Sequence, residues 1–364
     1  MGNSYSELSR LDDNDVIMVQ TGRDFPTNRR TAAGLYFPPR RRHPIVRPTV
    51  HLDTVNWLSS VRPEIVISCS SDKSIALHNI DTGACLTRWR GHQKEVTKVV
   101  YKRVGCAHFL LSGSKDATIR LWHFNASECR KVFAGHHKLT VTGLTALDEV
   151  RFVSGGRDGR MALWDVGEAA RPVRSVGNSQ NVVTHIDQSS DAKTLYQTAE
   201  DGTLRLWDAQ NLSPICQLSS STSLWHCSTS NAEPNICLTA GGGALGDGCV
   251  VELWDLRQRK RLQQFRGHEK AVRCAIFLQQ QQVTWKNLIL SVSGDKTVRL
   301  WEANSARCVW TETAPAALNC CVGSSDGSVV VGGECATLCD FRLSEKAGRP
   351  FLFCNSFQSN NDIN

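Results

Sequence analysis

Hydrophobic residues recur along the chain in short runs of four to eight, in which they alternate with polar residues or are rich in β-branched side chains. Gly, Ser and Asp residues separate the runs. A period of two bounded by turn-forming residues is typical of short antiparallel strands. The pattern therefore predicts an all-β fold that contains many short strands.

Tryptophans divide this pattern into units of similar length. Five of the ten end a run of the Leu-Trp-Asp type, at separations of 42, 43, 47 and 47 residues: Trp122, Trp164, Trp207, Trp254 and Trp301. Degenerate copies lie on either side, with His78 and Cys339 at the Trp position. Self-similarity at a fixed period of this length indicates one repeated supersecondary unit, and we count seven such units.

A second set of residues keeps a fixed distance from each Trp position. An Asp lies six residues before that position in five units and seven before it in the fifth unit: Asp72, Asp116, Asp158, Asp201, Asp295 and, in the fifth unit, Asp247. Four residues before the Asp, four units have a serine: Ser68, Ser112, Ser154 and Ser291. A Gly-His pair opens three units, at Gly91-His92, Gly135-His136 and Gly267-His268, and His51 opens the first without its glycine.

Together these features resemble the WD-repeat (WD40) family of β-propellers, over about residues 44–354. The resemblance implies a seven-bladed propeller with four strands in each blade. Residues 1–43 are expected to be a disordered basic tail, and residues 355–364 a C-terminal tail. The outermost strand of the last blade is expected either from residues 45–48 or from residues 351–354, and Pro44 and Pro48 are tolerable on such an edge.

The resemblance also implies a structural role for the recurring side chains. In the family, a histidine, a serine or threonine, an aspartate and an indole form one buried hydrogen-bond network in each blade, so that each buried polar atom has a partner. Three complete tetrads are expected: His92, Ser112, Asp116 and Trp122; His136, Ser154, Asp158 and Trp164; His268, Ser291, Asp295 and Trp301. The fourth unit keeps only Asp201 and Trp207, with Thr198 as its candidate hydroxyl, and the fifth replaces the Gly-His pair near His226.

The charge is concentrated near the N-terminus. The chain has a net charge of +7, and between residues 25 and 50 it has six arginines and no acidic residue. Met1-Gly2 to Ser6 matches the N-myristoylation pattern at Gly2. A single myristoyl chain holds a membrane only marginally, and a polybasic segment supplies the second signal that stable anchoring needs. We therefore expect lipidation at Gly2 and membrane contacts from five arginines: Arg29, Arg30, Arg40, Arg41 and Arg42.

Two other interpretations of the arginine cluster stay open, a nuclear localisation signal and an RNA contact. Tyr36 and Phe37 are the only aromatic residues there for base stacking, and the rest of the chain is nearly neutral, so we expect no nucleic-acid partner.

The fifteen cysteines are spread from Cys69 to Cys354 without a C-x-x-C pair, and the first fifteen residues lack the apolar core of a signal peptide. This distribution predicts a reducing, cytoplasmic environment in which most thiols are small buried hydrophobic groups. The closest cluster does not have zinc-site spacing: Cys320, Cys321, Cys335 and Cys339. The absence of any stretch of 18 apolar residues predicts no transmembrane helix.

No motif supports an enzyme class. Ser, His and Asp recur in unit after unit, whereas a catalytic triad occurs once, so a structural role is favoured. Residues 241–246 satisfy G-x-G-x-x-G, but the residues that follow, 249–254, have the pattern of a strand and not of the helix that binds pyrophosphate. We predict no cofactor and no metal.

The expected interaction surface is the face of the propeller that bears the turn aspartates. The resemblance places on this face the residues just before those aspartates, and we expect the second residue after each repeat histidine to lie nearby: Lys94, Lys115, Lys138, Arg157, Glu200 and Lys270. They suggest a basic rim for an acidic peptide, although solvated turn lysines are an equally simple interpretation.

We therefore expect a non-enzymatic scaffold. A closer resemblance within the family implies cilium assembly or ciliary trafficking, with small-GTPase regulators among the partners and with location at the cilium or basal body. The alternative is a substrate receptor of a ubiquitin ligase.

Overall fold

The computed structural model describes residues 45–104, 107–167, 170–177, 181–230, 232–243, 248–278, 287–334, 336–346 and 348–358. These residues form twenty-nine strands. Within these ranges, no helix has the length and hydropathy needed to cross a membrane.

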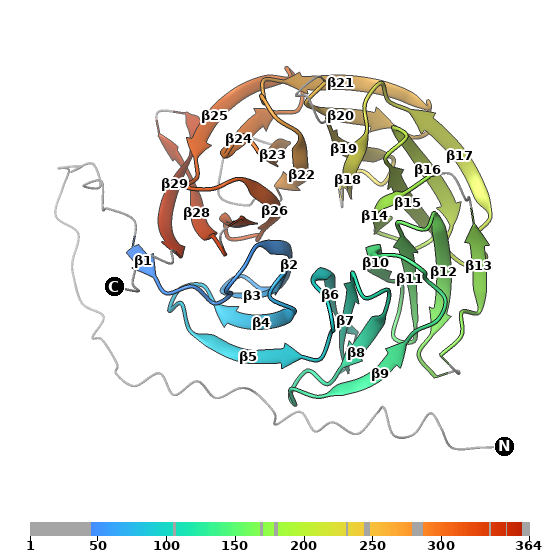
Figure 1. Cartoon of the computed structure of the whole chain (residues 1–364). Coiled ribbons are helices and arrows are strands. Elements are labelled where there is room, and N and C mark those ends of the chain that lie inside the picture. The colour runs from blue at the N-terminus through green and yellow to red at the C-terminus, as the bar shows by residue number, and fades with distance from the viewer. Residues whose placement is uncertain are drawn as a thin grey trace.

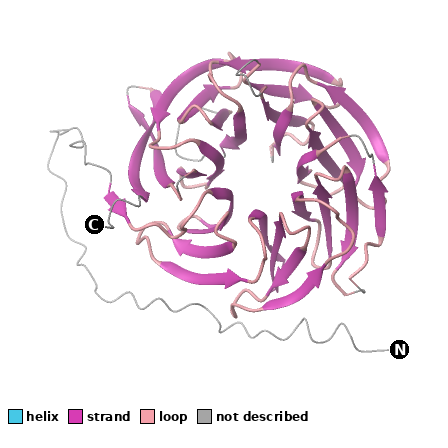
Figure 2. Ribbon diagram, in the orientation of Figure 1, coloured by secondary structure: helices cyan, strands magenta, loops and turns pink. Residues whose placement is uncertain are grey.

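Strands β2 to β29 form seven antiparallel sheets arranged around a central axis in chain order (Figure 1). Each sheet is one blade, and its four strands follow one another in chain order from the axis to the rim (Figure 2). The all-β, seven-bladed prediction is confirmed.

The blades are numbered here in chain order. Blade 1 contains β2 (Val55–Arg62), β3 (Ile65–Ser70), β4 (Ser74–Asn79) and β5 (Cys85–Arg90). Blade 2 contains β6 (Val96–Val104), β7 (Ala107–Ser114), β8 (Ile119–Trp122) and β9 (Cys129–Phe133). Blade 3 contains β10 (Val141–Ala146), β11 (Arg151–Gly156), β12 (Arg160–Asp165) and β13 (Arg174–Gly177). Blade 4 contains β14 (Val183–Gln188), β15 (Thr194–Ala199), β16 (Thr203–Asp208) and β17 (Pro214–Ser219).

The remaining blades follow the same order. Blade 5 contains β18 (Leu224–Thr229), β19 (Ile236–Gly241), β20 (Val250–Asp255) and β21 (Lys260–Arg266). Blade 6 contains β22 (Val272–Leu278), β23 (Leu288–Ser293), β24 (Thr297–Glu302) and β25 (Arg307–Thr313). Blade 7 contains β26 (Leu318–Gly323), β27 (Ser328–Gly333), β28 (Leu338–Lys346) and β29 (Arg349–Gln358), and β1 (Ile45–Arg47) pairs with it.

The hydrophobic core lies between neighbouring blades. The second strand of a blade is buried on both faces, so β3 and β23 consist entirely of buried residues, whereas the outer strand β17 is mostly exposed. One buried cluster joins blades 2 and 3, and another joins blades 6 and 7. Burial of apolar area between blades is therefore what holds the ring together.

Both termini of the described chain contribute to ring closure. Strand β29 is the fourth strand of blade 7 and pairs antiparallel with β28. Strand β1 adds a fifth, parallel strand outside it, with Ile45 opposite Ser356 (Figure 1). The two expected candidates for the outermost strand are thus both used, and β29 continues to Gln358, beyond the expected end of the propeller at residue 354.

A chain of buried hydrogen bonds fixes the turns within blade 2. The Trp122 indole N–H donates to Ser112 Oγ at 2.8 Å, and Ser112 Oγ lies 2.7 Å from His92 Nε2. His92 Nδ1 lies 2.9 Å from Asp116 Oδ2, and this carboxylate also accepts the backbone N–H of Gln93. When the Ser112 hydroxyl donates to His92 Nε2 and His92 Nδ1–H donates to Asp116, each donor in this network has an acceptor.

Blade 6 repeats this network with the residues expected. The Trp301 indole donates to Ser291 at 2.8 Å, His268 Nε2 lies 2.8 Å from the same hydroxyl, and His268 Nδ1 lies 2.9 Å from Asp295.

Blade 3 uses a different histidine from the one expected. His137 Nε2 lies 2.8 Å from Ser154 Oγ, and His137 Nδ1 lies 3.1 Å from Asp158 Oδ1, so the expectation for His136 is wrong. The glycine before the pair explains the difference, because Gly135 has a φ of 82° whereas Gly91 and Gly267 have φ values of 158° and 151°. This turn leaves His136 partly exposed, 3.3 Å from Ser175 Oγ, and directs the following imidazole inward.

Other blades keep parts of the network. In blade 1, His51 contacts Ser68 and Asp72 at 2.7 and 2.9 Å, and His78 takes the place of the indole. In blade 5, the Trp254 indole donates to Thr239 at 2.9 Å.

In blade 4 the indole acceptor is a side-chain amide and not a hydroxyl. The Trp207 N–H donates to Gln197 Oε1 at 2.8 Å, so the expectation for Thr198 is wrong. Gln197 lies ten residues before its tryptophan, as Ser112 does in blade 2, and the Thr198 hydroxyl instead lies 2.9 Å from Thr184 Oγ1.

The adjacent histidines of blade 3 give a matched pair of variants. His137→Ala is expected to lower the free energy of unfolding by about 2 kcal/mol, because it leaves buried groups of Ser154 and Asp158 without their partner. His136→Ala is expected to cost less than about 1 kcal/mol, since its side chain is partly exposed. Urea unfolding of both variants measures the difference, and equal losses would contradict the assignment of His137.

The turn aspartates also predict how stability depends on pH. Burial alone raises the pKa of Asp158, but hydrogen bonds from His137 and the Lys138 N–H outweigh it and lower the pKa to about 2. The same balance holds the pKa values of three other turn aspartates well below the ordinary range: Asp72, Asp116 and Asp295.

A carboxylate whose pKa is lowered by folding stabilises the fold above its unfolded pKa, about 4, and loses that contribution as pH falls towards the folded pKa. The unfolding free energy is therefore expected to fall between about pH 4 and pH 2. Urea titrations at a series of fixed pH values measure this decrease. In the Asp158→Asn variant, the unfolding free energy is expected to depend less steeply on pH. A pH-independent free energy over this range would refute the assignment.

Candidate functional site at the mouth of the central channel

Each inner strand has a β-bulge near its first residue. In all seven blades the strand pairing skips the second residue of the inner strand. These residues lie on the face that bears the turn aspartates, because each inner strand begins directly after the histidine loop of its blade. They surround the mouth of the central channel: Asn56, Thr97, Thr142, Thr184, Trp225, Arg273 and Asn319. Bulges re-aim side chains and are common beside functional sites.

Five of the seven bulge residues each donate a side-chain hydrogen bond to the first residue of the next blade's inner strand. Asn56 donates to the carbonyl of Val96 at 2.8 Å, and Thr184 donates to that of Leu224 at 2.7 Å. Asn319 closes the ring by donating to Val55 at 3.2 Å. Thr97 and Thr142 donate in the same way to Val141 and Val183. We call this set of five bonds the girdle.

The girdle is interrupted on either side of blade 6. Trp225 and Arg273 occupy the bulge positions of blades 5 and 6, and within the described ranges no side chain donates to the carbonyls of Val272 or Leu318 at the corresponding positions. Instead, the Trp225 indole donates to the carbonyl of Gly242 at 3.0 Å, and the Arg273 guanidinium lies 5.0 Å from the centroid of the Trp225 ring.

The Trp225–Arg273 pair has the properties of an interaction site. The indole is half-buried and held in one orientation by its hydrogen bond, while Arg273 is exposed and has its guanidinium over the ring face. Arginine and tryptophan are enriched among residues that dominate binding energy, and a stacked guanidinium keeps its N–H groups free to bind a carboxylate. This pair is therefore the candidate functional site.

The expected basic rim is partly neutralised by neighbouring acids. Lys115 pairs with Glu95 at 3.0 Å, and both side chains are exposed. The exposed Arg157 lies 3.5 Å from the partly buried Glu200. Lys94 and Lys270 are exposed and form no ion pair with any residue that the structure describes. The rim is thus mixed in charge rather than uniformly basic.

Lys138 differs from the other rim lysines because His137, and not His136, is the repeat histidine. Its backbone N–H donates to Asp158 at 2.9 Å, so it occupies the position of Gln93 and not that of Lys94.

Side chains from several blades meet inside the channel. The Trp57 ring of blade 1 lies 4.9 Å from the His185 ring of blade 4 and 5.4 Å from the His226 ring of blade 5, so it reaches across the axis. The ammonium group of Lys98 lies 2.9 Å from the centroid of the same indole. Burial lowers the pKa of Lys98 to about 7 and lowers that of His185 as well. His226 therefore belongs to the channel and not to a tetrad.

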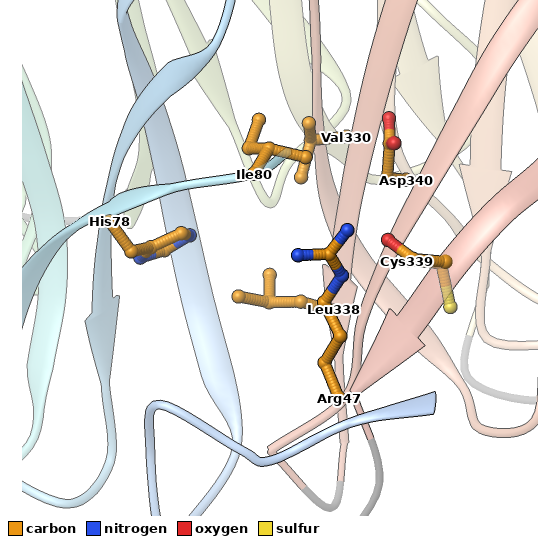
Figure 3. Close-up of a pocket in the computed structure, with 8 residues that line it drawn as sticks. Arg47, His78, Ile80, Val330, Leu338, Cys339 and Asp340 are labelled. Carbon is orange, nitrogen blue, oxygen red and sulfur yellow. The ribbon is translucent and has the colours of Figure 1, made fainter. Parts of the chain in front are cut away.

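A small cavity lies between blades 1 and 7, where both blades lack the tryptophan. It has a volume of about 20 Å³, enough for one water molecule. His78 lines it, and neither of its ring nitrogens has a hydrogen-bond partner in the described protein. Figure 3 shows the side chain of Arg47 extending from β1 into the space between His78 and Asp340. Arg47 is thus part of the propeller rather than of the basic tail, and burial lowers the pKa of His78 to about 3.

Two expectations concern metals and termini. Among the described residues, no group of three or more His, Cys, Asp or Glu side chains is placed to hold a metal ion. Gly2 and Cys335 lie outside the described residues. So do the five tail arginines expected to contact a membrane: Arg29, Arg30, Arg40, Arg41 and Arg42.

The fold and its repeated networks define the chain as a propeller that carries WD40 repeats. The family model described as "WD domain, G-beta repeat" matches residues 83–123, 127–165, 170–208 and 259–302. Human WD repeat-containing protein 37 is 24% identical over 276 residues, which cover 73% of this chain and 52% of that protein. Nuclear distribution protein nudF of Emericella nidulans is 24% identical over 240 residues, covering 58% of this chain and 51% of that protein.

Nuclear distribution protein PAC1 of Arthroderma otae is 26% identical over 290 residues, covering 71% of this chain and 61% of that protein. The chain is thus homologous to WD-repeat proteins, and it spans about half the length of the first two. WD40 propellers generally bind protein partners and are generally non-enzymatic.

Proposed function

We propose that this protein is a non-enzymatic scaffold that binds an acidic segment of a partner protein at the mouth of its channel. The interrupted girdle carries this proposal, since two of seven equivalent positions replace a structural hydrogen bond with Trp225 and Arg273. Structural demands alone favour the Asn or Thr that five blades use.

The chemistry of the interruption fits an acidic peptide backbone. Arg273 offers a planar set of N–H donors to a carboxylate, and the Trp225 face supplies apolar contact area. Lys94 and Lys270, which have no acidic partner in the described chain, add long-range attraction that raises the rate of encounter.

The cellular role that we propose is cilium assembly or ciliary trafficking, with small-GTPase regulators among the partners. Its support is the resemblance to WD repeat-containing protein 31 of three segments and one insertion: His51–Val55, Asn181–His185, Glu200–Trp207, and Gly246–Cys249 before Leu253–Gln258. We also propose a membrane tether formed by a myristoyl group on Gly2 together with the tail arginines, because each signal alone holds a membrane weakly.

Charge reversal at the channel mouth tests the docking site. Affinity capture from extracts of ciliated cells is expected to lose a defined set of proteins when Arg273→Glu or Trp225→Ala replaces the wild type. Lys115→Glu is the matched control on the same face, because Lys115 is already paired with Glu95. An unchanged set of captured proteins for Arg273→Glu would refute the site, and a ubiquitin-ligase adaptor among the lost proteins would favour the ligase role over the ciliary one.

The tether has its own test. Gly2→Ala is expected to move most of the protein from the membrane fraction to the soluble fraction of cells, since it removes the N-terminal glycine whose α-amino group would accept the myristoyl group. Replacing the five tail arginines with Gln is expected to weaken membrane association most strongly at low ionic strength, because salt already screens their attraction to anionic lipids. A membrane fraction that Gly2→Ala leaves unchanged would refute the tether.

A further inference from the structure

Cys274 lies between two chemically active neighbours in the wall of the channel. It is on the inner strand of blade 6, and its sulfur is 3.4 Å from Cys321 Sγ of blade 7 and 3.5 Å from His226 Nε2 of blade 5. All three side chains are buried. The two thiols belong to the apolar cluster that joins blades 6 and 7.

The contacts favour a thiolate at Cys274. Burial alone raises the pKa of this thiol, but the S–H of Cys321 donates to it and the His226 imidazole lies beside it, and together they lower the pKa. Burial and the neighbouring Cys274 raise the pKa of Cys321, which therefore keeps its proton. Other titratable groups near Cys274 include Lys98, His185, Asp187 and the buried thiols of Cys69, Cys227 and Cys320, and the charged forms of Lys98 and Cys274 attract each other.

We propose that Cys274 and Cys321 form a peroxide-reactive dithiol that closes to a disulfide between blades 6 and 7. The geometry supplies the three groups that this reaction needs: a nucleophilic sulfur, an imidazole within contact distance of it, and a second thiol within contact distance. The oxidant is hydrogen peroxide, which is close to water in size.

The reaction proceeds in two displacement steps. The Cys274 thiolate attacks one peroxide oxygen, forming an S–O bond and breaking the O–O bond, and the departing hydroxide takes a proton from His226 to leave as water. The Cys321 sulfur then attacks the sulfenic sulfur of Cys274, forming the S–S bond and breaking the S–O bond. The second hydroxide leaves as water with the Cys321 proton. Two thiols lose two electrons, and one peroxide gains them.

Three other cysteines that the structure describes lack this combination: Cys85, Cys308 and Cys320. Cys85 and Cys308 are exposed, and the sulfur of Cys308 has only the Trp310 carbonyl and the Thr311 hydroxyl nearby. Cys320, next to Cys321 in sequence, instead donates to the carbonyl of Gly332. Burial raises its pKa.

The dithiol adjoins the proposed docking residues. Cys274 directly follows Arg273, and His226 directly follows Trp225, so a sulfur displacement on β22 is transmitted to the channel mouth. This consequence rests on the proposed function, whereas the oxidation chemistry stands independently of it.

Peptide mapping of the full chain tests the chemistry. The reduced protein is treated with one equivalent of hydrogen peroxide, alkylated in denaturant and digested without reductant. A Cys274–Cys321 linked peptide is expected to appear before Cys85 and Cys308 are modified. Recovery of Cys274 and Cys321 as free thiols after Cys85 and Cys308 have reacted would overturn the proposal.

Variants separate the roles of the three groups. His226→Asn is expected to slow disulfide formation about tenfold, because an ordinary thiol is only a few per cent thiolate at neutral pH. Cys321→Ser is expected to stop at a sulfenic acid on Cys274 that dimedone traps. Cys320→Ser is the matched control and is expected to oxidise at the wild-type rate, while equal rates for His226→Asn and the wild type would overturn the role of His226.

Partner capture by oxidised and reduced protein separates this inference from the proposed function. A disulfide that forms without altering capture refutes only the link to docking. Loss of capture on oxidation of the wild type, but not of Cys321→Ser, supports that link.

Discussion

Buried polar groups that need hydrogen-bond partners are the constraint on which this propeller depends. Seven sheets packed face to face bury the turn residues inside each blade and the first carbonyls of each inner strand. The His–Ser–Trp–Asp networks satisfy the first set, and the girdle satisfies most of the second. An unsatisfied buried donor or acceptor costs about 1–3 kcal/mol, so a departure from either pattern has to be balanced elsewhere.

The departures fall into two kinds. Between blades 1 and 7, His78 and Cys339 replace the indoles and leave a cavity with room for one water, and the Arg47 side chain of β1 extends into it. Around blade 6, Trp225 and Arg273 replace hydrogen bonds with a half-buried indole that has an exposed guanidinium over its ring. The first departure stays inside the fold, where neither His78 ring nitrogen has a hydrogen-bond partner among the described residues, whereas the second leaves the exposed Arg273 guanidinium directed to the solvent.

Repeat spacing predicted the architecture because each indole anchors one blade at one position, as Trp122 and Trp301 show. Spacing alone does not choose between His136 and His137, since the choice depends on the backbone conformation of Gly135. It also does not show that the amide of Gln197, rather than the Thr198 hydroxyl, accepts from Trp207. Both errors concern which of two adjacent side chains points inward, and strand register and bulges decide that.

The side-chain contacts inside the channel could not be predicted from the sequence, for a different reason. Trp57, His185 and His226 belong to blades 1, 4 and 5 and meet only because the ring closes. Likewise, Cys274 and Cys321 lie 47 residues apart in sequence but 3.4 Å apart between their sulfurs. The Trp225–Arg273 pair does have a sequence signal, because both residues occupy the second position of an inner strand, where the other blades have Asn or Thr. This signal can be recognised only after the seven inner strands have been aligned at their bulges.

The central claim is that the interrupted part of the girdle is the docking site. Hydrogen exchange of the full chain, with and without a protein that the wild type captures and Arg273→Glu does not, tests it most directly. The account predicts slower exchange in residues 222–226 and 269–274, with little change in the outer strands. Protection confined to the opposite face or to the outer strands would contradict it.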